Sequence, residues 1–135
     1  MYHRTLRFAP LLVLLLVPAL QSCGVAAGAA AGTAAGLAYS DRGAETNVTA
    51  STATVAKATN DVLRDMNIGI TSTEHDRDDD RIEIKGKQGD RDVNVNIDGD
   101  RDSGSTHVEV TVKKNVVDYD RDRAAQILSQ IMRRL

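Results

Sequence analysis

A chain of 135 residues, with 41% hydrophobic and 27% charged residues and a formal net charge of −2, has the size of one domain. Its single cysteine excludes an internal disulfide framework and a zinc site built from several thiolates. The slight excess of acid, one Phe, three Tyr and no Trp argue against a nucleic-acid partner, which calls for basic patches and aromatic stacking platforms.

Residues 1–22 have the pattern of an export signal. Arg4 and Arg7 precede an apolar run from Phe8 to Leu20, which is too short to cross a bilayer as a helix. The run ends in a segment that resembles the lipobox of bacterial lipoproteins, with a leucine three positions before the cysteine and a small residue directly before it: Leu20, Gln21, Ser22 and Cys23.

The lipobox resemblance implies a covalent anchor on Cys23. In lipoproteins this thiol receives a diacylglyceryl group, cleavage makes it the new N-terminus, and a further acyl chain follows in many bacteria. Two or more chains hold a protein stably on a bilayer. By resemblance to known sorting rules, Gly24 in place of an aspartate implies the outer membrane, with the protein facing the periplasm. The implied partner is membrane lipid, and no other cofactor is predicted.

Residues 23–43 form a membrane-proximal segment that is rich in glycine and alanine. On a helix, positions four apart share one face, so the glycines would form a stripe that lets another helix pack closely. The segment resembles the glycine zippers of bacterial envelope proteins. The alternative is a small-residue linker between lipid and domain. The helix-packing positions are Gly24, Gly28, Gly32 and Gly36.

Residues 44–135 are predicted to form the folded domain. A short strand is expected over 46–50. Ser51 or Thr52 is suited to cap a helix running to about Met66, because apolar residues recur there at helical spacing. A second helix is expected at the C-terminus, capped by Asp118 or Asp120, with its apolar stripe at Ala124, Ile127, Leu128, Ile131 and Leu135.

Between these helices, β-branched residues alternate with polar ones in four segments joined by short polar connections. This pattern is typical of an antiparallel sheet with one solvated face. We therefore expect a two-layer α+β fold, β-α-β-β-β-β-α, in which two helices cover a sheet of four to five strands, preceded by the signal peptide and a Gly/Ala-rich helix. The segments are marked by Ile68 and Ile70, Ile82 and Ile84, Val93 to Ile97, and Val108 to Val112.

The order of these parts resembles a family of small bacterial outer-membrane lipoproteins that carry a domain of unknown function. The resemblance rests on the lipobox, the Gly/Ala-rich stretch, the helix TATVAKATNDVLRDMNI, the strands and the C-terminal helix QILSQIMRRL. It implies no catalytic residue.

The triplet Asp-Arg-Asp occurs four times, at three predicted turns and one helix start, and solvated turns with local ion pairs are its favoured interpretation. The alternative is a weak calcium loop, because alternate acids and an acid at the twelfth position provide suitable oxygen ligands. Ser103 stands where such a loop needs its glycine. The candidate ligands are Asp98, Asp100, Asp102 and Glu109.

Catalysis has little support in the sequence. His75 lies in an acidic turn and His107 begins a strand, and no nucleophile elbow, zinc-binding helix motif or phosphate-binding loop is present. We therefore expect no enzyme and no small-molecule substrate. The leading hypothesis is a lipid-anchored protein with a structural or partner-binding role in the envelope. The alternatives are a self-assembling glycine-zipper protein and a calcium-binding module.

Overall fold

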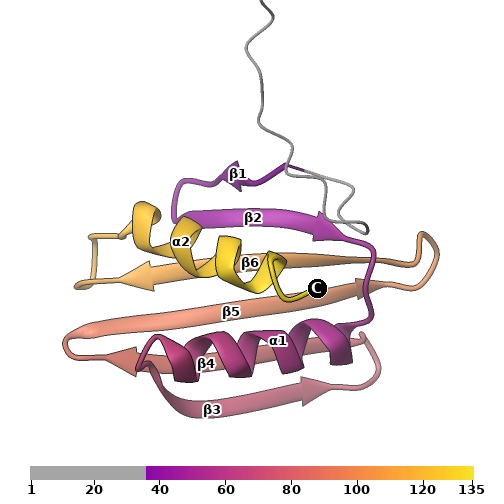
Figure 1. Ribbon diagram of the computed structural model, residues 1–135, viewed down its shortest axis with the longest axis horizontal. Coiled ribbons are helices and arrows are strands. Elements are labelled where there is room, and N and C mark those ends of the chain that lie inside the picture. The colour runs from indigo at the N-terminus through magenta and orange to yellow at the C-terminus, as the bar shows by residue number, and fades with distance from the viewer. Residues whose placement is uncertain (1–35) are drawn as a thin grey trace, which may run out of the picture.

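The computed structural model describes residues 36–135, which fold into a six-stranded antiparallel sheet with two helices on one face (Figure 1). The order across the sheet is β1-β2-β6-β5-β4-β3. The predicted α+β class and the antiparallel sheet under two helices are confirmed. The strand bounds are Ala38–Tyr39 for β1, Gly43–Val48 for β2, Gly69–Asp76 for β3, Arg81–Gln88 for β4, Arg91–Asp100 for β5 and Ser105–Lys113 for β6.

The six strands exceed the predicted four to five. The additional strand, β1, lies N-terminal to residue 44, inside the segment interpreted as membrane-proximal. β2 begins at Gly43 and ends at Val48, so it starts before the predicted range of 46–50. Neither segment offers the run of β-branched residues on which strand prediction depends.

The helices are α1, Thr52–Asp65, and α2, Arg121–Met132. Ser51 caps α1 by accepting a hydrogen bond from the Thr54 N–H at 3.3 Å, and Asp120 caps α2 through the Arg123 N–H at 3.1 Å. Asn67 follows the C-cap residue of α1, Met66, and has a positive φ of 54°, a conformation that asparagine tolerates just after a helix.

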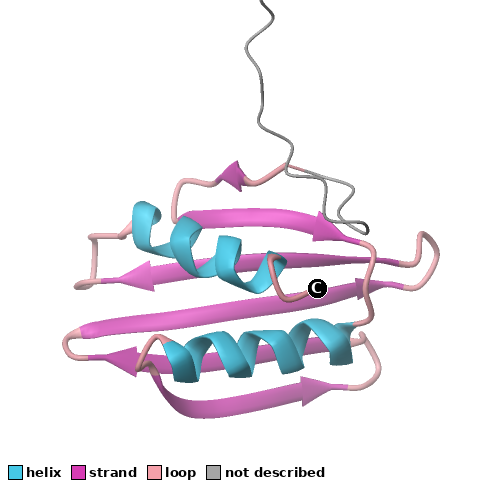
Figure 2. Cartoon of the chain, in the orientation of Figure 1, coloured by secondary structure: helices cyan, strands magenta, loops and turns pink. Residues whose placement is uncertain are grey.

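Both helices lie on the same side of the sheet (Figure 2). α1 contacts β3, β4 and β5, whereas α2 contacts β2 and β6, and the two helices also touch each other. The core between these layers is aliphatic and contains no aromatic ring among the described residues. Its largest fully buried side chains are Leu63, Ile84, Ile97, Ile127, Leu128 and Ile131.

The hairpins are tighter than the sequence predicts. The polar segments 75–80 and 98–104 are among the short connections that the alternating pattern predicts, but each is partly strand, because β3 continues to Asp76 and β5 to Asp100. Aspartate side chains close the turns. Asp100 Oδ1 accepts hydrogen bonds from two backbone N–H groups, at 2.9 and 3.3 Å, and Asp76 Oδ1 accepts one at 3.1 Å.

Residues 1–35 lie outside the described part of the chain, and the predicted signal peptide, lipobox and Cys23 belong to them. Gly24, Gly28 and Gly32 also lie there. Gly36 is described and is not helical: its carbonyl oxygen accepts a hydrogen bond from Thr46 Oγ1 at 3.4 Å, just before β1. The predicted helical stripe of glycines therefore does not extend to Gly36. Within residues 36–135, no helix is long and apolar enough to cross a membrane.

Candidate functional site

The face of the sheet opposite the helices is open. Because side chains alternate along a strand, burying Val93, Val95 and Ile97 against the helices places Asn94 and Asn96 on the other face. The same alternation in β6 exposes Glu109 and Thr111 there, as the sequence predicts. The strands therefore arrange polar side chains in register on this face.

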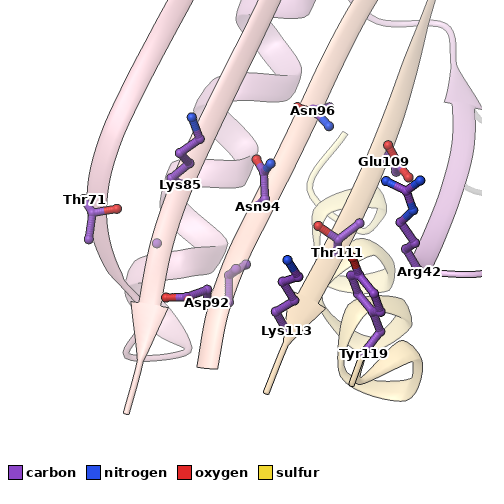
Figure 3. Close-up of a pocket in the computed structure, with 12 residues that line it drawn as sticks. Arg42, Thr71, Lys85, Asp92, Asn94, Asn96, Glu109, Thr111, Lys113 and Tyr119 are labelled. Atoms are coloured by element: carbon purple, nitrogen blue, oxygen red, sulfur yellow. The ribbon is translucent and has the colours of Figure 1, made fainter. Parts of the chain in front are cut away.

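A hollow of about 440 Å³ lies on this face, across β3 to β6, and we call it the open-face hollow (Figure 3). Its lining contains cations, carboxylates, amides, hydroxyls and the ring of Tyr119. The polar residues on it include Arg42, Lys85, Asn94, Asn96, Glu109, Thr111 and Lys113.

One side of the hollow is held by a charged network centred on Lys85. Its Nζ lies 3.0 Å from Glu83 Oε2 and 3.1 Å from Glu74 Oε1. Asn94 Nδ2 donates to Glu83 Oε1 at 2.8 Å. The hydrogen bonds from Lys85 and then Asn94 lower the pKa of Glu83, and the hydrogen bonds to Glu83 and Glu74 raise the pKa of Lys85.

Asn94 has unused hydrogen-bonding capacity in this network. Its Oδ1 is buried and has no hydrogen-bond partner among the described residues, although its amide nitrogen is paired with Glu83. A fixed amide with a free acceptor beside a tethered ammonium suits recognition of a polar group, such as a peptide bond or a hydroxyl.

Tyr119 and Lys113 form the lower end of the hollow in Figure 3. Lys113 Nζ lies 5.6 Å from the centroid of the Tyr119 ring, which is within the range of a cation–π contact. An antiparallel bridge between the same two residues holds them together. Arg42, from the turn between β1 and β2, lines the hollow as well. Sequence reasoning missed Arg42 and Tyr119, because both reach the hollow from loops.

The candidate calcium ligands lie in different settings. Asp98 forms an ion pair with Arg81. Asp100 is engaged in its own turn, where Ser103 Oγ lies 2.7 Å from Oδ2, and this hydrogen bond and those from the Asp102 and Ser103 N–H groups lower the pKa of Asp100. Glu109 lines the open-face hollow. Within residues 36–135, no three His, Cys, Asp or Glu side chains are grouped so as to hold a metal ion.

The two histidines of the folded region are at the surface. His107 Nδ1 lies 3.0 Å from Asn47 Oδ1, and its Nε2 lies 4.0 Å from Glu45 Oε2. His75 lies near the end of β3, which is exposed along almost its whole length. Neither histidine lines the open-face hollow. The described residues of the hollow offer charges, amides and an aromatic ring, with which it can bind a ligand.

Comparison with curated proteins gives no match to this chain. A protein family does match: the family described as "Protein of unknown function (DUF3568)" covers residues 7–134, and so includes all but the last residue of the folded domain and most of the N-terminal segment. Because the match spans nearly the full chain, this protein belongs to the DUF3568 family, whose function is unknown.

Proposed function

We propose that this protein is a non-catalytic, lipid-anchored protein of the bacterial cell envelope, which binds an envelope protein through the open face of its sheet. The anchor is Cys23, whose thiol receives a diacylglyceryl group and which becomes the N-terminus when residues 1–22 are removed, and the membrane is the outer membrane. The support for the anchor is the sequence alone: a basic start, an apolar run, then Leu20, Gln21, Ser22 and Cys23.

One structural observation supports the binding role: a polar hollow of about 440 Å³ on a sheet face that neither helix covers. A surface kept only for solubility has no need of a buried, unpaired amide oxygen such as Asn94 Oδ1. The mixture of Lys85, Glu109 and Tyr119 favours a polypeptide partner, since it combines charges of both signs with a ring.

Replacing the anchoring cysteine tests the membrane half of the proposal. We expect Cys23→Ala to abolish acylation and to move the protein from the membrane fraction to the soluble fraction, because no thiol remains to carry the acyl chains. Metabolic labelling with a fatty acid and flotation of membranes measure the two effects. Unchanged flotation of Cys23→Ala would reject the anchor.

Site-specific photo-crosslinking tests the binding half. A photoreactive residue in place of Asn96, which lines the hollow, should give a discrete adduct with an envelope protein in intact cells. The matched position is Lys57, whose side chain is 82% exposed on α1, on the helix side of the domain. The same adducts from both positions, or none from Asn96, would contradict binding at the open face. Mass spectrometry of the adduct identifies the partner.

A further inference from the structure

The exposed large hydrophobic side chains lie in the half of the sheet in which β6 ends. Tyr39, on the edge strand β1, is level with Val110, and Ile70, on the opposite edge strand β3, is level with Val112. The other two lie in the loop that follows β6. Among the described residues, the exposed large hydrophobics are Tyr39, Ile70, Val116 and Val117.

The loop between β6 and α2, residues 113–119, holds two valines away from the domain, and we call it the valine loop. A bridge between Lys113 and Tyr119 closes its base. Asn115 Oδ1 accepts hydrogen bonds from two backbone N–H groups of the loop, at 3.1 and 3.0 Å. Val116 and Val117, at the tip, are 86% and 85% exposed. The exposure is therefore fixed by a hydrogen-bonded turn.

Charge is distributed unevenly between the two ends of the sheet. The valine loop contains two lysines and one aspartate. At the other end, the hairpin segments 76–81 and 98–102 contain seven aspartates and three arginines. These hairpins meet the start of β6, and a strand of nine residues separates them from the valine loop by about 30 Å. An anionic surface would attract the valine end and repel the opposite end.

We propose that the valine end contacts an anionic phospholipid surface, with Val116 and Val117 entering the headgroup region. Two side chains at a loop tip are far too few for a stable protein interface, which buries about 800 Å² on each partner. They suit a lipid interface, where tyrosine rings and lysine side chains also concentrate. Tyr39 and Lys113 supply these at the same end.

This inference rests on the proposed function, because an acylated Cys23 keeps the domain beside the bilayer. Twelve residues separate Cys23 from Gly36, the first described residue. Such a tether raises the local concentration of lipid around the domain, so a weak contact of two valines is enough to orient it. The orientation directs the acidic hairpins into the aqueous space.

Fluorescence quenching tests the orientation on the full, acylated chain. Acylation consumes the only native thiol, so Val117→Cys and Ser103→Cys each introduce a single site for an environment-sensitive dye. Ser103 is the matched control, because it lies in an exposed turn at the acidic end. Each labelled protein is placed in phosphatidylglycerol vesicles that contain a lipid-borne quencher.

We expect a blue-shifted, strongly quenched dye at position 117 and an aqueous, weakly quenched dye at position 103. Adding Val116→Asp to the Val117→Cys chain should reduce quenching to the level of position 103, and circular dichroism checks that the fold is kept. Equal quenching at both positions in chains that float with the vesicles would overturn the lipid contact alone. Chains that carry no acyl group and fail to float would overturn the anchor, and the lipid contact with it.

Discussion

Gly43→Ala should destabilise the domain by about 3 kcal/mol. This value is the upper end of the usual cost of overpacking, because the neighbouring atoms are held rigidly. A Cβ added at Gly43 would lie 1.9 Å from the carbonyl oxygen of Val110. That oxygen belongs to the backbone of β6, which is paired on both sides, by β2 and β5, and has no room to retreat. Urea denaturation of the Cys23→Ala chain, which lacks acyl groups, measures the loss, and the melting temperature should fall by roughly 15 °C.

Gly69→Ala is the matched control for this effect. Gly69 also lies in a strand, but the nearest atom to an added Cβ is the Lys87 carbonyl oxygen at 3.7 Å, an ordinary contact. We expect a change within about 0.5 kcal/mol, since an alanine also reduces the entropy of the unfolded chain. Similar costs at the two glycines would show that strand propensity, and not the contact between β2 and β6, sets the requirement at position 43.

The elements that the sequence predicts best are those whose burial repeats regularly. In β4, β5 and β6, apolar β-branched residues alternate with polar ones, and both helices carry an apolar stripe, so the structure agrees with the expected types and faces. β2 contributes Gly43, Ala44, Thr46 and Val48 to the interior, a mixture that does not look like a buried strand face. Its position follows from pairing with β6, which is a tertiary effect.

Part of the candidate site also follows from the local sequence pattern. Period-two alternation correctly places Asn94, Asn96 and Glu109 on the solvated face, because that inference needs only local pattern. The open-face hollow as a unit depends on how four strands align, and on two loop residues, Arg42 and Tyr119, brought in from opposite ends of the domain sequence. Long-range register of this kind has no signature in a single sequence.

Thr59→Val should stabilise the domain by about 1–2 kcal/mol, which is the range for removing a buried polar group that lacks a hydrogen bond. Thr59 lies in α1 and is 0% exposed, and its Oγ1 has no hydrogen-bond partner among the described residues. Valine keeps the branched shape and replaces the hydroxyl with a methyl group, so the packing of α1 against the sheet is preserved. Denaturant unfolding of the Cys23→Ala chain measures the gain.

The identical substitution at Thr106 should have the opposite sign. Thr106 is 2% exposed on β6, and its Oγ1 donates to the carbonyl oxygen of Ala50 at 2.5 Å, next to the residue that caps α1. Thr106→Val leaves that carbonyl without this donor, so we expect a loss of about 1–2 kcal/mol. The comparison separates the hydrogen bond from the methyl-for-hydroxyl exchange itself. If both variants gained stability, burial of an apolar group would outweigh the bond to Ala50; if both lost it, the Thr59 hydroxyl would have a partner in solution.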